Sequence, residues 1–181
     1  MKLRRSDYAI LGLLRLGPGS GYDIKQRIDR SVAFFWNESY GQIYPRLKAL
    51  EAEGLVKGRE TPSARGGVRH VYSLTRRGAK ALDAWIEEPV VPAPPRSELL
   101  LKLFIAGEPS LPALERHLVA HARDLRAELQ QHAATHTLIS DTEPGDVAWT
   151  LRRLTLDFGE RTARAELAWA EHALEALGEL T

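Results

Sequence analysis

The sequence predicts a mainly α-helical protein in which an N-terminal winged helix-turn-helix domain is followed by a second domain that is wholly helical. Three observations predict this fold class. Residues 5–54 carry apolar side chains at helical spacing in three short runs, and two stretches typical of short strands follow them. A proline-rich stretch, 89–95, comes next, and two long segments with helical periodicity lie beyond it. The order helix, helix, helix, strand pair is that of a winged helix-turn-helix.

Capping residues and glycines bound the first three predicted helices. Ser6 or Asp7 is expected to cap a helix that the sequence GPGSG ends. Ser20 or Gly21 begins the second helix, and the third contains the sequence GQIYPRLKAL. Gly54 follows the third helix in the position where glycine commonly ends one.

Two short strands are predicted next, over Leu55–Glu60 and Val68–Leu74, and together they form a basic hairpin. Thr75 is expected to cap a fourth helix. The apolar residues of this helix fit one core-facing stripe, which consists of Leu82, Trp85 and Ile86.

The prolines of residues 89–96 mark a linker between two domains, which we place at residues 1–88 and 97–181. Beyond the linker, a short apolar segment precedes two long helices, Leu111–Ile139 and Pro144–Leu180. The first long helix has one apolar stripe and therefore needs one packing partner. This stripe consists of Leu111, Leu114, Leu118, Ala122, Leu125, Leu129 and Ala133. The second has two stripes, and a helical hairpin within one chain covers only one of them.

We therefore expect the last helix to pair with its counterpart in a second subunit, which makes the second domain a dimerisation domain and the protein a homodimer. The residues assigned to the dimer interface are Leu151, Leu154, Phe158, Ala165 and Trp169. The other apolar stripe of the same helix contains Leu156, Ala163, Leu167, Ala170, Leu174 and Leu177.

Charge separates the two domains. Residues 1–88 hold 16 of the 25 Lys and Arg and 10 of the 24 Asp and Glu, so their net charge is +6, whereas residues 89–181 carry −5. A basic half favours a polyanion as partner. The absence of cysteine excludes disulfides, thiol catalysis and cysteine-ligated metals. Neither a signal peptide nor an apolar run of the ~20 residues that span a membrane is found, so we expect a cytoplasmic protein with no membrane partner.

The helix that contains GQIYPRLKAL has an outward face with few long side chains. With Ile43, Leu47 and Leu50 directed inward, a turn of about 100° per residue defines the outward positions. These positions are occupied by Gly41, Pro45, Ala49 and Ala52. Such a face lets the helix backbone approach DNA closely, while Gln42 can hydrogen-bond a base edge and Lys48 can contact a phosphate.

Other residues near this helix are suited to contact the DNA backbone. Pro45 is expected near the first turn, where its missing N–H costs least. Arg65, Arg69 and His70 lie at or near the hairpin tip, where a basic loop can follow the phosphates or enter the minor groove. The N–H groups after Ser20 form a helix N-terminus, which can bind a phosphate or serve as an ordinary cap.

Three segments resemble motifs of the PadR family of bacterial transcriptional regulators, in the same order and spacing over residues 3–88: LGLLRLGPGSGYDI, GQIYPRLKALEAEGLV and RHVYSLTRRG. The last two helices resemble, by pattern and length, the dimerising domain of the larger family members. The resemblance implies a homodimer that binds a palindromic double-stranded DNA operator, usually as a repressor, and that a small molecule such as a phenolic acid releases. The wing departs from the family pattern, with Val68 and His70 where members often carry a proline and further basic residues.

Two sets of binding residues follow from the predicted faces and the resemblance. We expect DNA contacts from Ser20, Tyr22, Ser39, Tyr40, Gln42, Tyr44, Pro45, Lys48, Arg65 and Arg69. Aromatic residues near the domain junction can line a pocket for a flat aromatic effector, or can simply pack in the core: Phe35, Trp36, Trp85, Phe104 and Trp149. No nucleotide-binding or hydrolase fingerprint is present, so we expect neither catalysis nor a cofactor.

Two alternative functions stay open at this point. Winged helices also bind proteins, so one alternative is a protein-interaction module, which the basic first domain disfavours. The other is a metal-responsive regulator, because His117 with His121 and His132 with His136 are four residues apart on a helix. No carboxylate completes a recognisable metal motif with either pair, which favours interface or cavity-lining histidines.

Overall fold

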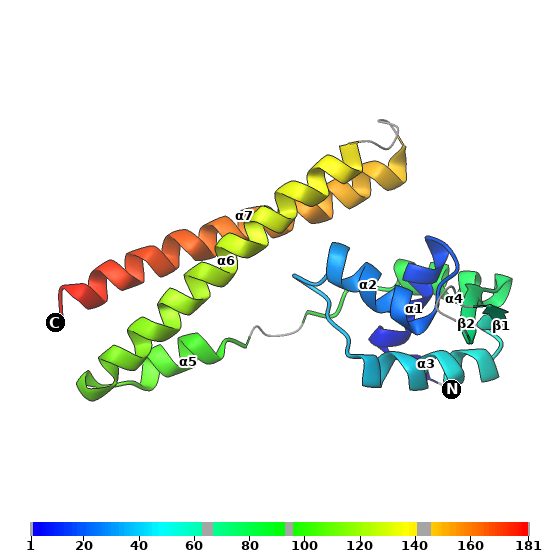
Figure 1. Ribbon diagram of the computed structural model, residues 1–181, viewed down its shortest axis with the longest axis horizontal. Helices are drawn as coiled ribbons and strands as arrows, with labels where there is room; N and C mark the ends of the chain where they lie inside the picture. The colour runs from blue at the N-terminus through cyan, green and yellow to red at the C-terminus, as the bar shows by residue number, and fades with distance from the viewer. Residues whose placement is uncertain (1, 63–66, 93–95, 141–145, 181) are drawn as a thin grey trace. The chain divides into compact units, whose positions relative to one another are not determined.

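The structure of the protein is a computed structural model. The residues that it describes are 2–62, 67–92, 96–140 and 146–180, with the backbone alone for 136–140. The chain divides into two compact units, Met1–Pro92 and Ala93–Thr181, and this division falls within the proline-rich stretch. Both units are mainly helical, as the sequence predicts (Figure 1).

The first unit is a winged helix-turn-helix. Its described elements are α1 (Arg5–Arg15), α2 (Gly21–Ser31), α3 (Tyr40–Ala52), β1 (Val56–Pro62), β2 (Val68–Leu74) and α4 (Arg76–Glu87). The two strands are antiparallel, with Val56 opposite Leu74 and Gly58 opposite Tyr72. Gly19, in the turn after α1, also pairs with Tyr72, so that β2 is held on its second edge.

The predicted caps of α2, α3 and α4 are confirmed. Ser20 is the N-cap of α2, and the hydroxyl of Thr75 accepts a hydrogen bond from the Gly78 N–H at 3.0 Å at the start of α4. Gly54 follows α3 with a φ of 67°, a left-handed conformation that favours glycine. Because these residues satisfy backbone groups within a few positions of themselves, their roles can be read from local sequence.

Helix α1 begins earlier than the sequence predicts. Arg4 is its N-cap residue, and Asp7, a predicted cap, instead occupies the third helical position. From there its carboxylate accepts a hydrogen bond from the Arg4 N–H at 2.7 Å. The prediction of Ser6 or Asp7 as the cap is therefore wrong, because an acid in the third position can satisfy the N-cap N–H by reaching back.

The core of the first unit collects apolar side chains from every element: Ile10, Leu11, Leu13, Leu14, Ile24, Ile28, Ile43, Leu47, Leu50, Leu55, Val56, Tyr72 and Leu82. Trp85 packs at its edge and stacks on Tyr8, with ring centroids 4.7 Å apart. Ile86 does not belong to this core, contrary to the prediction, and is 60% exposed. Leu82 and Trp85 lie three residues apart on the inward side, and Ile86 lies about 100° further round the helix.

The second unit is a long helical hairpin with a short helix beside it. Its described elements are α5 (Glu98–Ile105), a 3₁₀ turn η1 (Glu108–Ser110), α6 (Leu111–Ser140) and α7 (Val147–Gly178). Helices α6 and α7 run antiparallel and side by side, and α5 packs near the start of α6 (Figure 1). None of the helices described by the structure is long and apolar enough to cross a membrane.

The two apolar stripes of α7 have different environments. The stripe that packs against α6 includes Leu156, Ala163 and Ala170, all of which are buried. On α6, Leu118 and Ala122 form one cluster with Ala170. The buried apolar residues of α6 lie on the predicted stripe: Leu114, Leu118, Ala122 and Leu125. Ala133, predicted to belong to the α6 stripe, is exposed.

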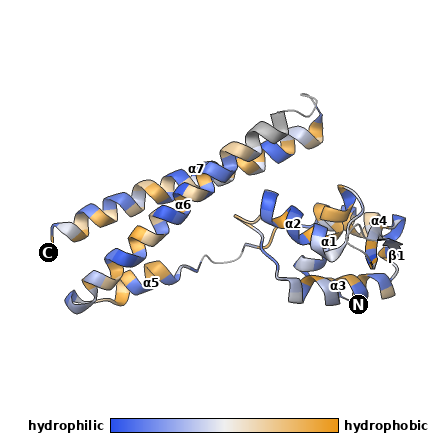
Figure 2. Cartoon of the chain, viewed as in Figure 1, coloured by the Kyte–Doolittle hydropathy of each residue, from blue (hydrophilic) through white to orange (hydrophobic). Residues whose placement is uncertain are grey.

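The other stripe of α7 is largely exposed within one chain. Leu151, Leu154 and Phe158 are 57%, 60% and 63% exposed, and Ala165 is exposed as well. Trp169 differs from these four residues, because it is half-buried and packs against the cluster of α6 and α7. Hydrophobic residues are also frequent on α5, which is coloured mostly orange in Figure 2, and Phe104 on this helix is 88% exposed.

Candidate nucleic-acid interface

Helix α3 has a buried face and a face that is open to solvent. Ile43, Leu47 and Leu50 are each 0% exposed and anchor the helix in the core. On the opposite side, Gly41, Pro45 and Ala52 are exposed and Ala49 is half-buried, flanked by the exposed side chains of Gln42, Tyr44 and Lys48. The surface of the helix that lies away from the core therefore carries small or apolar residues between polar ones.

Pro45 was expected near the first turn of α3, but it lies in the second turn. The helix begins at Tyr40, so Pro45 is its sixth residue and lies in the second turn. A residue with an N–H at this position would donate to the carbonyl of Gly41, four residues back. Proline leaves that carbonyl without its helical donor, and this carries a cost that a first-turn proline avoids.

Three tyrosines gather where α2 meets the first turns of α3. The rings of Tyr22 and Tyr40 are stacked, with centroids 6.3 Å apart and planes 15° apart. Tyr44 lies over Gly21, where a Cβ atom would come within 2.6 Å of the tyrosine ring and displace it. All three rings are about half exposed. Their hydroxyl groups are of the kind that bonds DNA phosphates.

Ser39 and Gln42 form a reciprocal cap at the start of α3. The Oε1 atom of Gln42 accepts hydrogen bonds from the N–H and the hydroxyl of Ser39, at 3.0 and 3.1 Å. The NH₂ group of Gln42 makes no hydrogen bond with any described residue and remains on the exposed side of the helix. Gln42 can therefore offer a donor to a base edge while its oxygen orients the side chain.

Ser20 occupies a different environment from the other predicted DNA contacts. It is only 7% exposed, and its hydroxyl donates to the Asp23 carboxylate at 3.0 Å. The structure thus gives Ser20 the role of a helix cap, one of the two roles considered from sequence. Tyr22, two residues on, is exposed, and its hydroxyl accepts a hydrogen bond from Gln26 at 2.8 Å.

The wing is tied to α2 by an ion pair. The guanidinium of Arg69 donates to Oδ2 of Asp23, the oxygen that also accepts from the Ser20 N–H at 2.7 Å. Burial alone raises the pKa of Asp23, but the hydrogen bonds from Ser20 and Arg69 outweigh it and lower that pKa below its usual value. Arg65, the other arginine predicted to contact DNA from the wing, lies outside the described residues.

A second ion pair, which sequence reasoning missed, joins α1 to α3. Asp7 is 0% exposed and accepts a hydrogen bond from Nε of Arg46 at 2.6 Å and another from its terminal nitrogen. Hydrogen bonding to Asp7 raises the pKa of Arg46. Arg46 follows Pro45 directly but points inward, so it is a structural residue of α3. The only local signal for it was an acid inside the apolar run of the first helix.

The aromatic residues predicted to bind an effector are divided between the two units. Phe35 is 50% exposed, and the indole Nε1 of Trp36 is buried without an acceptor among the described residues. Trp85 is stacked on Tyr8, as described above. In the second unit, Phe104 is largely exposed and Trp149 lies under the Arg153 guanidinium at 4.8 Å.

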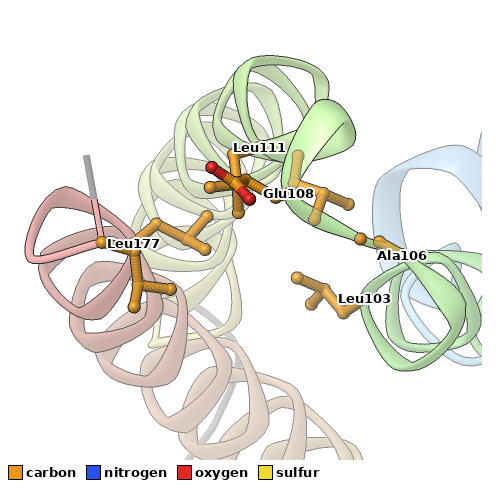
Figure 3. Close-up of a pocket in the computed structure, with 8 residues that line it drawn as sticks. Leu103, Ala106, Glu108, Leu111 and Leu177 are labelled. Atoms are coloured by element: carbon orange, nitrogen blue, oxygen red, sulfur yellow. The ribbon is translucent and has the colours of Figure 1, made fainter.

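The second unit contains an apolar pocket that the sequence analysis did not identify. Its volume is about 460 Å³, and it is lined by Leu103, Ala106, Gly107, Glu108, Leu111, Leu114, Leu177 and Leu180. Figure 3 shows leucines from α5, α6 and α7 around it and the carboxylate of Glu108 among them. None of the five predicted effector residues lines this pocket.

The histidines of α6 contact carboxylates one at a time. His121 lies 3.5 Å from Glu166, and the buried His132 lies 3.2 Å from Glu128. Within the described part of the chain, no group of three His, Asp or Glu residues is placed to hold a metal ion. The side chain of His136 lies outside the described residues.

A winged helix-turn-helix with an open recognition-helix face, joined to a helical hairpin, defines a class of DNA-binding transcriptional regulators. Residues 10–84 match the model of the transcriptional regulator PadR-like family, and residues 95–178 match that of the virulence activator alpha C-terminal region. The first unit is thus similar to the PadR-like transcriptional regulators, and the second to the C-terminal region of virulence activators. The PadR-like family consists of DNA-binding regulators and not of enzymes.

Curated relatives and solved structures agree with this assignment. The negative transcriptional regulator PadR of Bacillus subtilis is 38% identical over 103 residues, which cover 56% of this chain and 57% of that protein. The match thus spans little more than half the length of this relative. The probable transcriptional regulator Rv1176c of Mycobacterium tuberculosis is 29% identical over 187 residues, which cover 95% of this chain and 97% of that protein.

Two solved structures of Bacillus subtilis PadR are similar in fold to the whole chain. The complex with operator DNA has a TM-score of 0.78 and 26% identity, and the alignment covers 96% of this chain and 99% of that one. The complex with p-coumaric acid has a TM-score of 0.69 and 26% identity, with coverage of 95% and 94%.

Proposed function

We propose that this protein is a homodimeric repressor that binds a palindromic DNA operator through α3 and the wing of each subunit, and that a small aromatic effector releases it. The observation that carries the DNA-binding part is the outward face of α3, where small and apolar residues lie between Gln42, Tyr44 and Lys48. A helix with this surface fits the major groove, which admits one α-helix. The complex of Bacillus subtilis PadR with operator DNA supports the same use of the fold.

The residues proposed to contact DNA divide into two kinds. Gln42 lies on the exposed side near the N-terminal end of α3, where recognition helices contact base edges. Tyr22, Tyr40 and Tyr44 lie around the same end, and Lys48 lies further along α3. All four side chains are exposed and suited to phosphates. Substitution of Gln42 should therefore change sequence preference, whereas substitution of Lys48 should weaken binding to all DNA alike.

The dimer is supported by the exposed stripe of α7. Three large residues of this stripe, Leu151, Leu154 and Phe158, are more than half exposed on a helix whose other side is already packed. Burial of a Leu or Phe side chain stabilises by roughly 1.5–3 kcal/mol. In a symmetric interface between the same stripes of two subunits, each of these residues is buried once in each subunit. This burial offsets the loss of rotational and translational freedom on association. Trp169 contributes mainly within the chain.

The DNA-binding face is tested by Ala49→Glu, which places a negative charge on the outward side of α3. The probe is a duplex selected from random DNA with the full-length protein, and affinity is measured by fluorescence anisotropy beside thermal melting. Ala84→Glu, an equal change at an exposed position of α4, is the matched control. We expect binding to be lost in Ala49→Glu and kept in the control. A folded Ala49→Glu variant that binds like the parent refutes this use of α3.

Repression is proposed because the Bacillus subtilis relative is named a negative regulator, although the C-terminal family model is named after a virulence activator. Transcription in vitro from a promoter that overlaps the selected site distinguishes the two. A repressor lowers transcript yield with increasing protein, and an activator raises it.

The effector is a second element of the proposal, and the indole N–H of Trp36 is the observation that favours it. A buried donor without an acceptor is costly, and a ligand carboxylate or carbonyl can satisfy it. The test titrates p-coumaric acid, the ligand of the Bacillus subtilis relative, and its methyl ester into the protein–DNA complex. Trp36→Phe keeps an aromatic ring without the N–H and should weaken release about tenfold, while Trp149→Phe serves as the comparison. Equal release from the parent and Trp36→Phe removes Trp36 from the site.

A further inference from the structure

The carboxylate of Asp23 connects the helix-turn-helix to the wing. Its Oδ2 atom accepts hydrogen bonds from the N–H and the hydroxyl of Ser20, at 2.7 and 3.0 Å, and from the guanidinium of Arg69. The side chains of Asp23 and Arg69 are 23% and 44% exposed. Asp23 is therefore fixed by its own helix cap, and Arg69 is the part of the contact that reaches solvent.

A second contact fixes the wing nearby. The backbones of Gly19 and Tyr72 exchange two hydrogen bonds, at 3.0 and 2.9 Å. Residues 19–23 thus hold β2 at two points, through the backbone at Tyr72 and through the side chain at Arg69. A two-stranded hairpin is marginally stable alone in water, so its position depends on such contacts.

The Arg69 guanidinium keeps donors for another partner. It carries five N–H groups in a planar fork, and within the described residues its contact with Asp23 is made by one terminal nitrogen. An arginine that is already held in place loses less side-chain freedom when a phosphate binds. A carboxylate and a phosphate can therefore share this guanidinium from different sides.

We infer that Asp23 is a positioning residue that presents Arg69 to a DNA phosphate and thereby increases the preference for the operator over other DNA. The inference rests on the proposed DNA-binding function. The negative charge of Asp23 weakens binding to DNA in general, since such binding depends on phosphate neutralisation alone. The contact of Asp23 with Arg69 favours the operator complex, in which the wing contacts the DNA backbone. Removal of the charge should therefore affect operator and random DNA in opposite directions.

The experiment compares four full-length variants on two duplexes, the selected operator and a scrambled sequence of the same composition. Asp23→Asn keeps the size of the side chain and an oxygen for the Ser20 cap, but it removes the charge that holds Arg69. Arg69→Ala and the double variant complete a double-mutant cycle. Asp29→Asn is the matched control, because Asp29 is an acid of the same helix that pairs with Lys25.

We expect Asp23→Asn to weaken operator binding about three- to tenfold per half-site, and to leave binding of scrambled DNA unchanged or tighter. In the Arg69→Ala background the same change should alter operator affinity less than about twofold, because its target is gone. The control should alter both duplexes alike.

Two results overturn the inference while the parent still prefers its operator. If Asp23→Asn tightens both duplexes equally, Asp23 merely repels phosphate. If its operator defect persists in full in Arg69→Ala, Asp23 acts through the α2 cap, and a matching fall in melting temperature for Ser20→Ala identifies that cause. A parent protein that does not distinguish the two duplexes contradicts the proposed function itself.

Discussion

Arg46→Ala is expected to destabilise the first unit strongly, although Arg46 belongs to the helix that we assign to DNA. The carboxylate of Asp7 is 0% exposed and receives hydrogen bonds from two nitrogens of Arg46 and from the Arg4 N–H. Alanine removes the cation and leaves the buried carboxylate with the backbone donor. Breaking one side of a buried ion pair costs about 3–5 kcal/mol. For a domain of this size, each kcal/mol lowers Tm by about 4–8 °C, so a decrease of roughly 12–40 °C is expected.

The assay is thermal unfolding followed by circular dichroism, together with operator affinity at several salt concentrations. A second variant, Asp7→Leu with Arg46→Met, replaces the pair by apolar side chains of similar volume. It should recover most of the lost stability, because no charge remains buried. Its operator affinity and salt dependence should equal those of the parent, since Arg46 faces the core and not the DNA.

Two outcomes refute this reasoning. One is an Arg46→Ala variant that melts within a degree or two of the parent, which means that Asp7 finds water or another partner. The other is a stable double variant whose salt slope, log K against log salt, is shallower by about one per subunit, because that is the loss expected when a phosphate contact disappears.

Three further changes test other parts of the molecule. Pro45→Ala supplies the N–H that donates to the Gly41 carbonyl, so it should stabilise α3 by about 1–3 kcal/mol and weaken operator binding; unchanged affinity means that the ring does not touch DNA. Leu151→Glu with Leu154→Glu should give monomers in sedimentation; a dimeric double variant places the interface elsewhere. Because the pKa of Asp23 is lowered by folding, its stabilising effect should be complete above about pH 4 and lost as pH falls through the lowered value. The difference in Tm between the parent and Asp23→Asn should therefore be full at pH 6 and shrink as pH falls below about 4, and a constant difference contradicts it.

Much of the fold could be predicted because the signals are local. Ser20 and Thr75 satisfy N–H groups three residues away, and Gly54 supplies a backbone conformation that other residues avoid. The strand Val68–Leu74 has the predicted bounds. The stripe of α6 and one stripe of α7 pack together in the chain as predicted, since helical spacing determines which residues share a face. The contact of α5 with α6 was not predicted, because one stripe was taken to need one partner.

The contacts that shape the candidate site could not be predicted in the same way. Asp7 and Arg46 are 39 residues apart, and Asp23 and Arg69 are 46 apart. Nothing in the sequence near either acid distinguishes a long-range ion pair from a helix-capping role. In the structure, Asp7 and Asp23 each accept hydrogen bonds at the start of their own helix and also form a long-range ion pair. The position of Pro45 in its helix was also not predicted correctly. Because α3 begins at Tyr40, a few residues earlier than expected, Pro45 lies in the second turn, where its missing N–H carries a cost.

In the first domain, the net charge must be distinguished from the positions and partners of the individual charged residues. Four described ion pairs join residues within the first unit: Arg15–Asp83, Lys25–Asp29, Arg46–Asp7 and Arg69–Asp23. Each pair is neutral, so the net charge of +6 over residues 1–88 comes from cations outside these pairs, of which Lys48 lies on the outward side of α3. General attraction to DNA depends on that surplus and is screened by salt. The paired arginines act differently, because Arg46 fixes the recognition helix to the core and Arg69, on our inference, aligns the wing. Salt dependence should therefore report chiefly on residues such as Lys48, and operator preference on Gln42 and on the Asp23–Arg69 pair.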